Sequence, residues 1–147
     1  MTGIDHCDWE DVSCKNSEGY VTFLNLYENQ LTGPIPQSIG NLDNLLKLDL
    51  HGNELTGPIP QSIGNLVNLT LLSFFSNELT GPVPETIGNL VNLRVLNLSI
   101  NKLTGPVPET IGNLVNLKLL RLAGNQLDPT PEWLTTFCRG RRPRCFF

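Results

Sequence analysis

The sequence contains no apolar run near the roughly 18 residues that a membrane-spanning helix needs. No basic stretch followed by an apolar one is visible after Met1, so we expect a secreted form to have lost its leader before that residue. The net charge is −4, and acids at the N-terminal end and arginines at the C-terminal end do not indicate a uniform face for nucleic acid. The sequence therefore predicts no membrane span in this chain and no nucleic-acid partner.

Cysteine and histidine are also scarce, at four and two residues. The cysteines lie in two C-x6-C pairs, and neither histidine belongs to a pair with metal-ligand spacing. Structural zinc sites typically use cysteines two to four residues apart, often with paired histidines. We therefore expect no metal and no cofactor in this protein.

Repetition dominates what the sequence does contain. Segment 79–92, LTGPVPETIGNLVN, recurs letter for letter at 103–116, and the related LTGPIPQSIGNL occupies 31–42 and 55–66. With a decayed copy that starts at Leu127, the spacing is 24 residues throughout. A fixed period of this size is typical of solenoids, in which each repeat buries its apolar edge against its neighbours. The sequence therefore predicts one domain, an α/β-type solenoid of five 24-residue repeats.

We expect three parts within this domain: an N-terminal cysteine cap over 1–20, the repeats over 21–127, and a C-terminal cap over 128–147. The first cap is acidic, whereas the last nine residues hold four arginines and no acid. The C-terminal cap is predicted to begin with a short helix whose N-cap is Thr130. Its arginines are predicted to form a loop between the last two cysteines.

Strands are predicted in the five stretches 21–30, 45–54, 69–78, 93–102 and 117–126. The first, fourth and sixth residues of each stretch are apolar, and side chains alternate between the two faces of a strand. The fourth and sixth residues should therefore enter the core, while the third, fifth and seventh line a concave parallel sheet. An asparagine follows each strand, and its amide both donates and accepts, which favours a structural ladder. The ladder residues are Asn29, Asn53, Asn77, Asn101 and Asn125.

The Thr-Gly-Pro-Ile/Val-Pro segment after each asparagine is not expected to be α-helical, because two prolines fix φ and remove amide donors. We predict extended and 3-10 backbone on the convex side.

Four cysteines allow three disulfide pairings. Stacked strands are ~4.8 Å apart, so caps on either side of five strands lie more than about 20 Å apart. A disulfide tolerates only about 7 Å between Cα atoms. The remaining pairing joins Cys7 to Cys14 and Cys138 to Cys145. Two structural disulfides imply an oxidising compartment.

The repeat L-x-x-L-x-L-x-x-N-x-L-T-G-x-I/V-P-x-x-I-G-N-L resembles the plant-specific class of leucine-rich repeat over about residues 21–127. The segment Cys7-x-Trp9-x-x-Val12-x-Cys14 is similar to the N-terminal cap of that class. The resemblance implies an extracellular right-handed solenoid with a concave parallel sheet. Members include receptor-kinase ectodomains, short co-receptor ectodomains and polygalacturonase-inhibiting proteins, which bind protein, peptide or small hormone ligands.

The concave face varies while the rest of the repeat is copied. The strand halves 69–78 and 93–102 differ at seven of ten positions, although the loop halves that follow them are identical. A recognition surface on a conserved scaffold would show this pattern, and relaxed drift on an unused face is the alternative.

Tyr27, His51 and Phe75 should lie side by side on neighbouring strands and form, with Phe23 and Leu71, an apolar and aromatic patch. Exposed patches of this kind mark contact sites, and aromatic residues are common interface anchors. The predicted ligand-binding residues are Phe23, Tyr27, Asp49, His51, Leu71, Phe75, Asn97 and Arg121.

These observations favour a non-catalytic extracellular module that binds a protein or peptide ligand in a receptor-like or co-receptor-like manner. A larger receptor and a secreted enzyme are further partner classes. One alternative is an inhibitor of a secreted cell-wall-degrading enzyme such as polygalacturonase, and another is a microbial, protist or engineered repeat scaffold.

An enzyme built on Ser73, His51 and Asp49 is disfavoured, because an open sheet supplies no pocket or oxyanion hole. The sequons at Asn68 and Asn97 would accept glycans in a secreted eukaryotic protein, although we favour a structural role for both.

Overall fold

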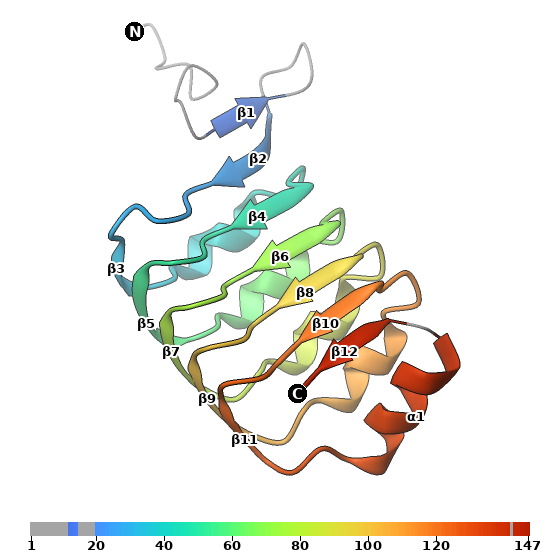
Figure 1. Cartoon of the computed structure of the whole chain (residues 1–147). Helices are drawn as coiled ribbons and strands as arrows, with labels where there is room; N and C mark the ends of the chain where they lie inside the picture. The colour runs from blue at the N-terminus through green and yellow to red at the C-terminus, as the bar shows by residue number, and fades with distance from the viewer. Residues whose placement is uncertain (1–11, 15–19, 142) are drawn as a thin grey trace, which may run out of the picture.

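The computed structural model describes residues 12–14, 20–141 and 143–147. Figure 1 shows successive coils of the chain stacked on one another from blue to red. Within the described residues the main sheet has the order β1-β2-β4-β6-β8-β10-β12, and every pair is parallel except β1 with β2. Its strands are β1 Val12–Cys14, β2 Val21–Asn25, β4 Lys47–Asp49, β6 Leu71–Ser73, β8 Val95–Asn97, β10 Leu119–Arg121 and β12 Arg144–Phe146.

The constant repeat length sets the register of this sheet. Leu48 pairs with Leu72 and Leu72 with Leu96, each 24 residues further along the chain. All three side chains have no exposed surface. Burying a leucine side chain stabilises a fold by about 1.5–3 kcal/mol, so the stacked rows supply much of the stability. The predicted solenoid with its parallel concave sheet is confirmed.

The first repeat is less well packed than the others. Leu24 and Leu26 of this repeat are only half-buried, although they occupy the same positions as Leu48 and Leu50. Both still contact the edge of the core. The difference follows from their place at the beginning of the array, where no earlier repeat covers them.

A second parallel sheet, which the sequence did not predict, follows the asparagine of each repeat. Its order is β11-β9-β7-β5-β3, and its strands form the lower left edge of the molecule in Figure 1. Proline disfavours a central strand because it lacks the amide donor. Here the prolines Pro34 and Pro58 fall at the ends of their strands, so pairing is kept. The bounds are β3 Thr32–Pro34, β5 Glu54–Pro58, β7 Glu78–Gly81, β9 Lys102–Gly105 and β11 Gln126–Leu127.

Short 3-10 helices form the convex side, as predicted. Gly88 shows how tightly the coils approach there, because a Cβ atom on it would lie 2.4 Å from Cβ and 2.6 Å from the carbonyl oxygen of Thr110. The Thr110 hydroxyl donates a hydrogen bond of 2.7 Å to the carbonyl of Glu85 in the coil before. The helices are η2 Gln37–Asn41, η3 Gln61–Asn65, η4 Glu85–Asn89 and η5 Glu109–Asn113.

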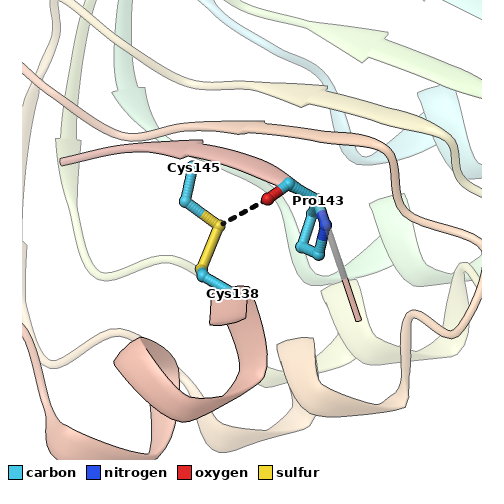
Figure 2. Close-up of a disulfide and its surroundings, with 3 residues drawn as sticks. All are labelled: Cys138, Pro143 and Cys145. Carbon is cyan, nitrogen blue, oxygen red and sulfur yellow. Dashed lines mark hydrogen bonds between the residues drawn. A yellow bond between two sulfur atoms is a disulfide. The ribbon is translucent and has the colours of Figure 1, made fainter. Parts of the chain in front are cut away.

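The C-terminal cap combines α1, Glu132–Arg141, with strand β12. A disulfide between Cys138 and Cys145 joins the two elements, with 6.1 Å between the Cα atoms, and confirms that predicted pair. Figure 2 shows the bridge together with the carbonyl oxygen of Pro143, which lies 3.6 Å from Sγ of Cys145. The predicted partner bridge, Cys7 with Cys14, lies outside the described residues.

Two predictions for this cap are wrong. The arginines predicted as a loop belong largely to regular structure, because Arg139 continues α1 and Arg144 begins β12. Strand β12 forms because β10 would otherwise leave a row of backbone groups unpaired at the end of the sheet. The helix begins one residue later than predicted, since the Pro131 carbonyl, rather than that of Thr130, accepts the first helical hydrogen bonds.

Candidate functional site

Backbone hydrogen bonds continue past the ends of the main strands and align the seventh residues of the repeats. The amide of Gly52 donates to the carbonyl of Phe75, and the amide of Ser76 donates to that of Ser99, at 2.9 and 3.0 Å. The same pattern joins Glu28 to His51 at 2.9 Å. Residues at the seventh position therefore lie in one row across the concave sheet.

The first three members of this row are aromatic, and we call Tyr27, His51 and Phe75 the aromatic row. The rings of Tyr27 and His51 are stacked, with centroids 4.9 Å apart and planes at 4°. The His51 and Phe75 rings are tilted by 38°, with centroids 6.2 Å apart. Tyr27 is 45% exposed, whereas the other two rings are partly covered. The three rings of the aromatic row therefore contact one another and remain accessible. They lie side by side on neighbouring coils, where the sequence predicted them to be.

Asp49 fixes the orientation of His51. Its Oδ1 atom lies 2.9 Å from Nδ1 of the imidazole and also accepts the backbone amide of His51 at 3.2 Å. Both side chains are about one quarter exposed. This predicted ligand-binding acid is thus hydrogen-bonded within the site, and the bond orients the central ring of the aromatic row.

The remaining predicted residues surround the row. Phe23 and Leu71 are partly buried, and the ammonium group of Lys47 lies 5.1 Å from the centre of the Phe23 ring. Asn97 is partly buried and accepts a 2.6 Å hydrogen bond from the hydroxyl of Ser99. Arg121 is exposed on β10, three strands from His51 along the sheet order, so it does not join the aromatic row.

Cations gather at the C-terminal end of the concave sheet, where Arg121 alone was among the predicted ligand-binding residues. Arg94 and Lys118 precede β8 and β10, Arg121 ends β10 and Arg144 begins β12, and all four are exposed. The Arg121 guanidinium lies 5.3 Å from the centre of the Phe146 ring. Pairing of β12 with β10 brings Arg144 next to β10. Because β12 was not predicted, this cluster was not predicted either.

The asparagine ladder is a backbone device rather than part of the concave surface. In Asn77, Nδ2 donates to the carbonyls of Leu50 and Phe74 at 2.9 and 3.1 Å, while Oδ1 accepts the Leu55 amide at 3.0 Å. Asn53 and Asn101 make equivalent bonds and are likewise buried. Asn125 repeats the pattern in the last repeat, after β10.

Asn29 differs from the other ladder residues. It is exposed, and its side chain donates one 3.2 Å hydrogen bond, to the carbonyl of Tyr27. The other asparagines bond to a carbonyl of the repeat before them, as Asn53 does to Leu26. Asn29 belongs to the first repeat, so no earlier repeat supplies such a carbonyl, and none of the described residues before that repeat does so.

The geometry does not assemble a catalytic triad. Asp49 and His51 are bonded, but Ser73 is 7% exposed, and no hydrogen bond joins it to His51 within the described chain. The two sequons also differ, since Asn68 is exposed and Asn97 is held in a turn on the concave sheet. The arrangement can bind and orient a ligand, and the described residues show no activated nucleophile.

Comparison with known proteins decides the family. The family model described as a leucine-rich repeat region matches residues 20–136. The chain is a leucine-rich repeat protein. A rice relative, the LRR receptor-like serine/threonine-protein kinase SIK1 of Oryza sativa subsp. japonica, is 46% identical over 47 residues. This match covers 32% of the leucine-rich repeat protein and 5% of the kinase, so the chain spans a small part of that relative.

Solved plant structures resemble the leucine-rich repeat protein over nearly its whole length. A chain of the BIR3–SERK2 complex from Arabidopsis thaliana matches with a TM-score of 0.85 and 36% identity, over 97% of this protein and 78% of that chain. A second match is the LRR ectodomain of the receptor kinase GASSHO1/SCHENGEN3 from Arabidopsis thaliana, in complex with CASPARIAN STRIP INTEGRITY FACTOR 2. Its TM-score is 0.87 and its identity 46%, over 92% of this protein and 17% of that chain. The predicted plant-type extracellular class is confirmed.

The described segments 12–14, 20–141 and 143–147 contain no helix that is both long and apolar enough to cross a bilayer.

Proposed function

We propose that this leucine-rich repeat protein is a non-catalytic recognition module that acts outside the cell or at its surface. It binds a peptide or protein ligand through the concave sheet, in a receptor-like or co-receptor-like role. The observation that carries the proposal is the aromatic row, in which the stacked rings of Tyr27 and His51 remain accessible on an open sheet. The relatives support it, because one was solved as the BIR3–SERK2 complex and another in complex with CASPARIAN STRIP INTEGRITY FACTOR 2.

The size of the concave sheet favours a short ligand. Its six parallel strands, from β2 to β12, span ~24 Å at ~4.8 Å per strand, and the accessible stretch along each strand is ~12 Å long. The projected area is therefore about 300 Å², well below the ~800 Å² that each partner contributes to a standard protein interface. An extended peptide fits this face, whereas a tight protein complex would have to include the edges and caps.

Selection from a displayed library of random dodecapeptides tests the proposal. Enriched peptides would be synthesised and their affinities measured by calorimetry for the wild type, for Tyr27→Ala/Phe75→Ala, and for the control Val91→Ala/Val115→Ala. The control removes two exposed apolar side chains from the turns before β8 and β10, away from the aromatic row. We expect the first variant to lose at least about tenfold in affinity, because aromatic anchors dominate binding energy.

The control should bind within about twofold of the wild type, since rim contacts contribute little. Equal affinities for the wild type and the Tyr27→Ala/Phe75→Ala variant, with both variants folded, would move the binding site off the concave sheet. Circular dichroism of both variants would establish that the solenoid is intact.

A further inference from the structure

The concave sheet has two chemically different halves. Over β2, β4 and β6 it presents the aromatic row, one acid, Asp49, which is bonded to His51, and one cation, Lys47, which lies over the Phe23 ring. Over β8, β10 and β12 no acid occupies an outward position, whereas two cations, Arg121 and Arg144, do. Arg94 and Lys118 are also exposed, just before β8 and β10.

The four cations are not neutralised within the described chain. Among its described residues Glu78 forms an ion pair with Lys102 and Asp49 is hydrogen-bonded to His51, and none of the four cations takes part in either contact. Arg121 instead lies over the Phe146 ring, which leaves its guanidinium edge able to bind a carboxylate through two parallel hydrogen bonds. The β8–β12 half is therefore a basic surface without an internal counter-charge.

Resting on the proposed function, we infer that the ligand is an extended peptide with an aromatic or large apolar side chain over β2–β6 and carboxylate side chains over β8–β12. The juxtaposition of the aromatic row with the uncompensated cations on one continuous sheet carries this inference. A peptide that crosses the strands in this orientation places each chemical group opposite its complement.

The strand spacing sets the distance between the two groups of the ligand. From His51, which follows β4, to Arg121 on β10 there are three strand intervals, or ~14 Å at ~4.8 Å each. An extended chain advances ~3.3–3.6 Å per residue, so the acid lies about four residues from the aromatic anchor. A spacing of one residue or of eight would leave one of the two halves empty.

A peptide fits this surface better than a uniform anionic polysaccharide. A polyanion that covered the whole sheet would place negative charge beside Asp49 as well as beside the arginines, and like charges repel. It would also leave the aromatic row without an apolar partner. The segregation of the two halves thus favours a ligand whose own chemistry changes along its length.

The test repeats the dodecapeptide selection on the wild type and on Arg121→Gln/Arg144→Gln. The matched control is Lys102→Gln/Arg139→Gln, which also removes two positive charges, but from exposed positions on β9 and α1. Each enriched peptide is also synthesised with its acids replaced by amides. Affinities are measured at low and high salt, and oligogalacturonate is added as an anionic competitor.

Peptides enriched on the wild type should carry an acid about four residues from an aromatic side chain. Their amide forms should bind the wild type at least about fivefold more weakly, and the Arg121→Gln/Arg144→Gln variant should lose that discrimination while the control keeps it. High salt should weaken the acidic form more than the amide form.

Failure of this inference differs from failure of the proposed function. Peptides that depend on Tyr27 and Phe75 but contain no preferred acid would overturn the inference and leave the recognition role standing. If no enriched peptide depends on the aromatic row, both fall. Oligogalacturonate that binds through Arg121 and Arg144 in the absence of any peptide binding would assign the basic half to a polysaccharide and also overturn the inference.

Discussion

The two parallel sheets are built from the same repeats, yet they tolerate different amounts of change. In the third and fourth repeats the concave strand halves, 69–78 and 93–102, differ at seven of ten positions. The halves that form most of the second sheet and the convex turn, 79–92 and 103–116, are identical. Outward side chains on the concave sheet contact the side chains of adjacent strands and leave their other side open to solvent. Convex residues such as Gly88, in contrast, must fit against the next coil. Packing constraint, rather than position in the chain, separates scaffold from surface.

The neighbouring residues Phe74 and Phe75 sharpen this comparison most strongly. Phe74 has no exposed surface, while Phe75 lies on the concave face and is partly exposed. Phe74→Ala should lower the free energy of unfolding by about 3–5 kcal/mol, because it removes a core ring and leaves a cavity. Phe75→Ala should lower it by less than about 1 kcal/mol. Urea unfolding followed by circular dichroism measures both values, and equal losses would contradict the division between core and surface.

A second comparison sets two asparagines of the same sequence position against each other. Asn77→Ala should cost about 2–3 kcal/mol, since it leaves the buried carbonyls of Leu50 and Phe74 without a donor. Asn29→Ala should cost less than about 0.5 kcal/mol, because that side chain is exposed and makes one long hydrogen bond. The same unfolding measurement applies. A large effect at Asn29 would show that the ladder begins one repeat earlier than the hydrogen bonds indicate.

The smallest expected effect concerns two glycines of the convex turns. Gly88→Ala should destabilise the protein by about 1–3 kcal/mol, because the new Cβ atom would overlap Thr110 and force the coils apart. Gly112 occupies the equivalent place in the last repeat, where a Cβ atom would meet nothing within 4 Å. Gly112→Ala should therefore be neutral or slightly stabilising. Thermal melting of the two variants checks the difference, and similar melting temperatures would remove close coil approach as the reason for glycine.

Much of this architecture could be predicted because the 24-residue period alone determines which residues stack. The parallel concave sheet, the buried rows such as Leu72 and Leu96, the placement of the aromatic row and the Cys138–Cys145 bridge all follow from spacing. The second sheet could not be predicted, because its strands contain prolines that normally argue against pairing.

Strand β12 lay outside the reach of the period as well. It is short, rich in arginine and belongs to no repeat, so only the unpaired edge of β10 explains it. The basic half of the concave sheet depends on this strand, which is why Arg121 was predicted to lie on the concave face while Arg144 was predicted to lie in a cap loop. The structure at the end of a solenoid depends on how the unpaired edge of the last repeat is covered, and the repeat pattern does not predict this.

The hydrogen bonds of the convex side have a consequence for how the protein can change over evolutionary time. The hydroxyls of Ser62, Thr86 and Thr110 each donate to a carbonyl 25 residues earlier, at 2.6–2.7 Å. Because every such bond joins a coil only to its neighbour, duplication of one 24-residue unit in the gene supplies a complete set of partners at once. The array can therefore lengthen or shorten by whole units without redesign, and the identical segments 79–92 and 103–116 are what a recent duplication would leave behind.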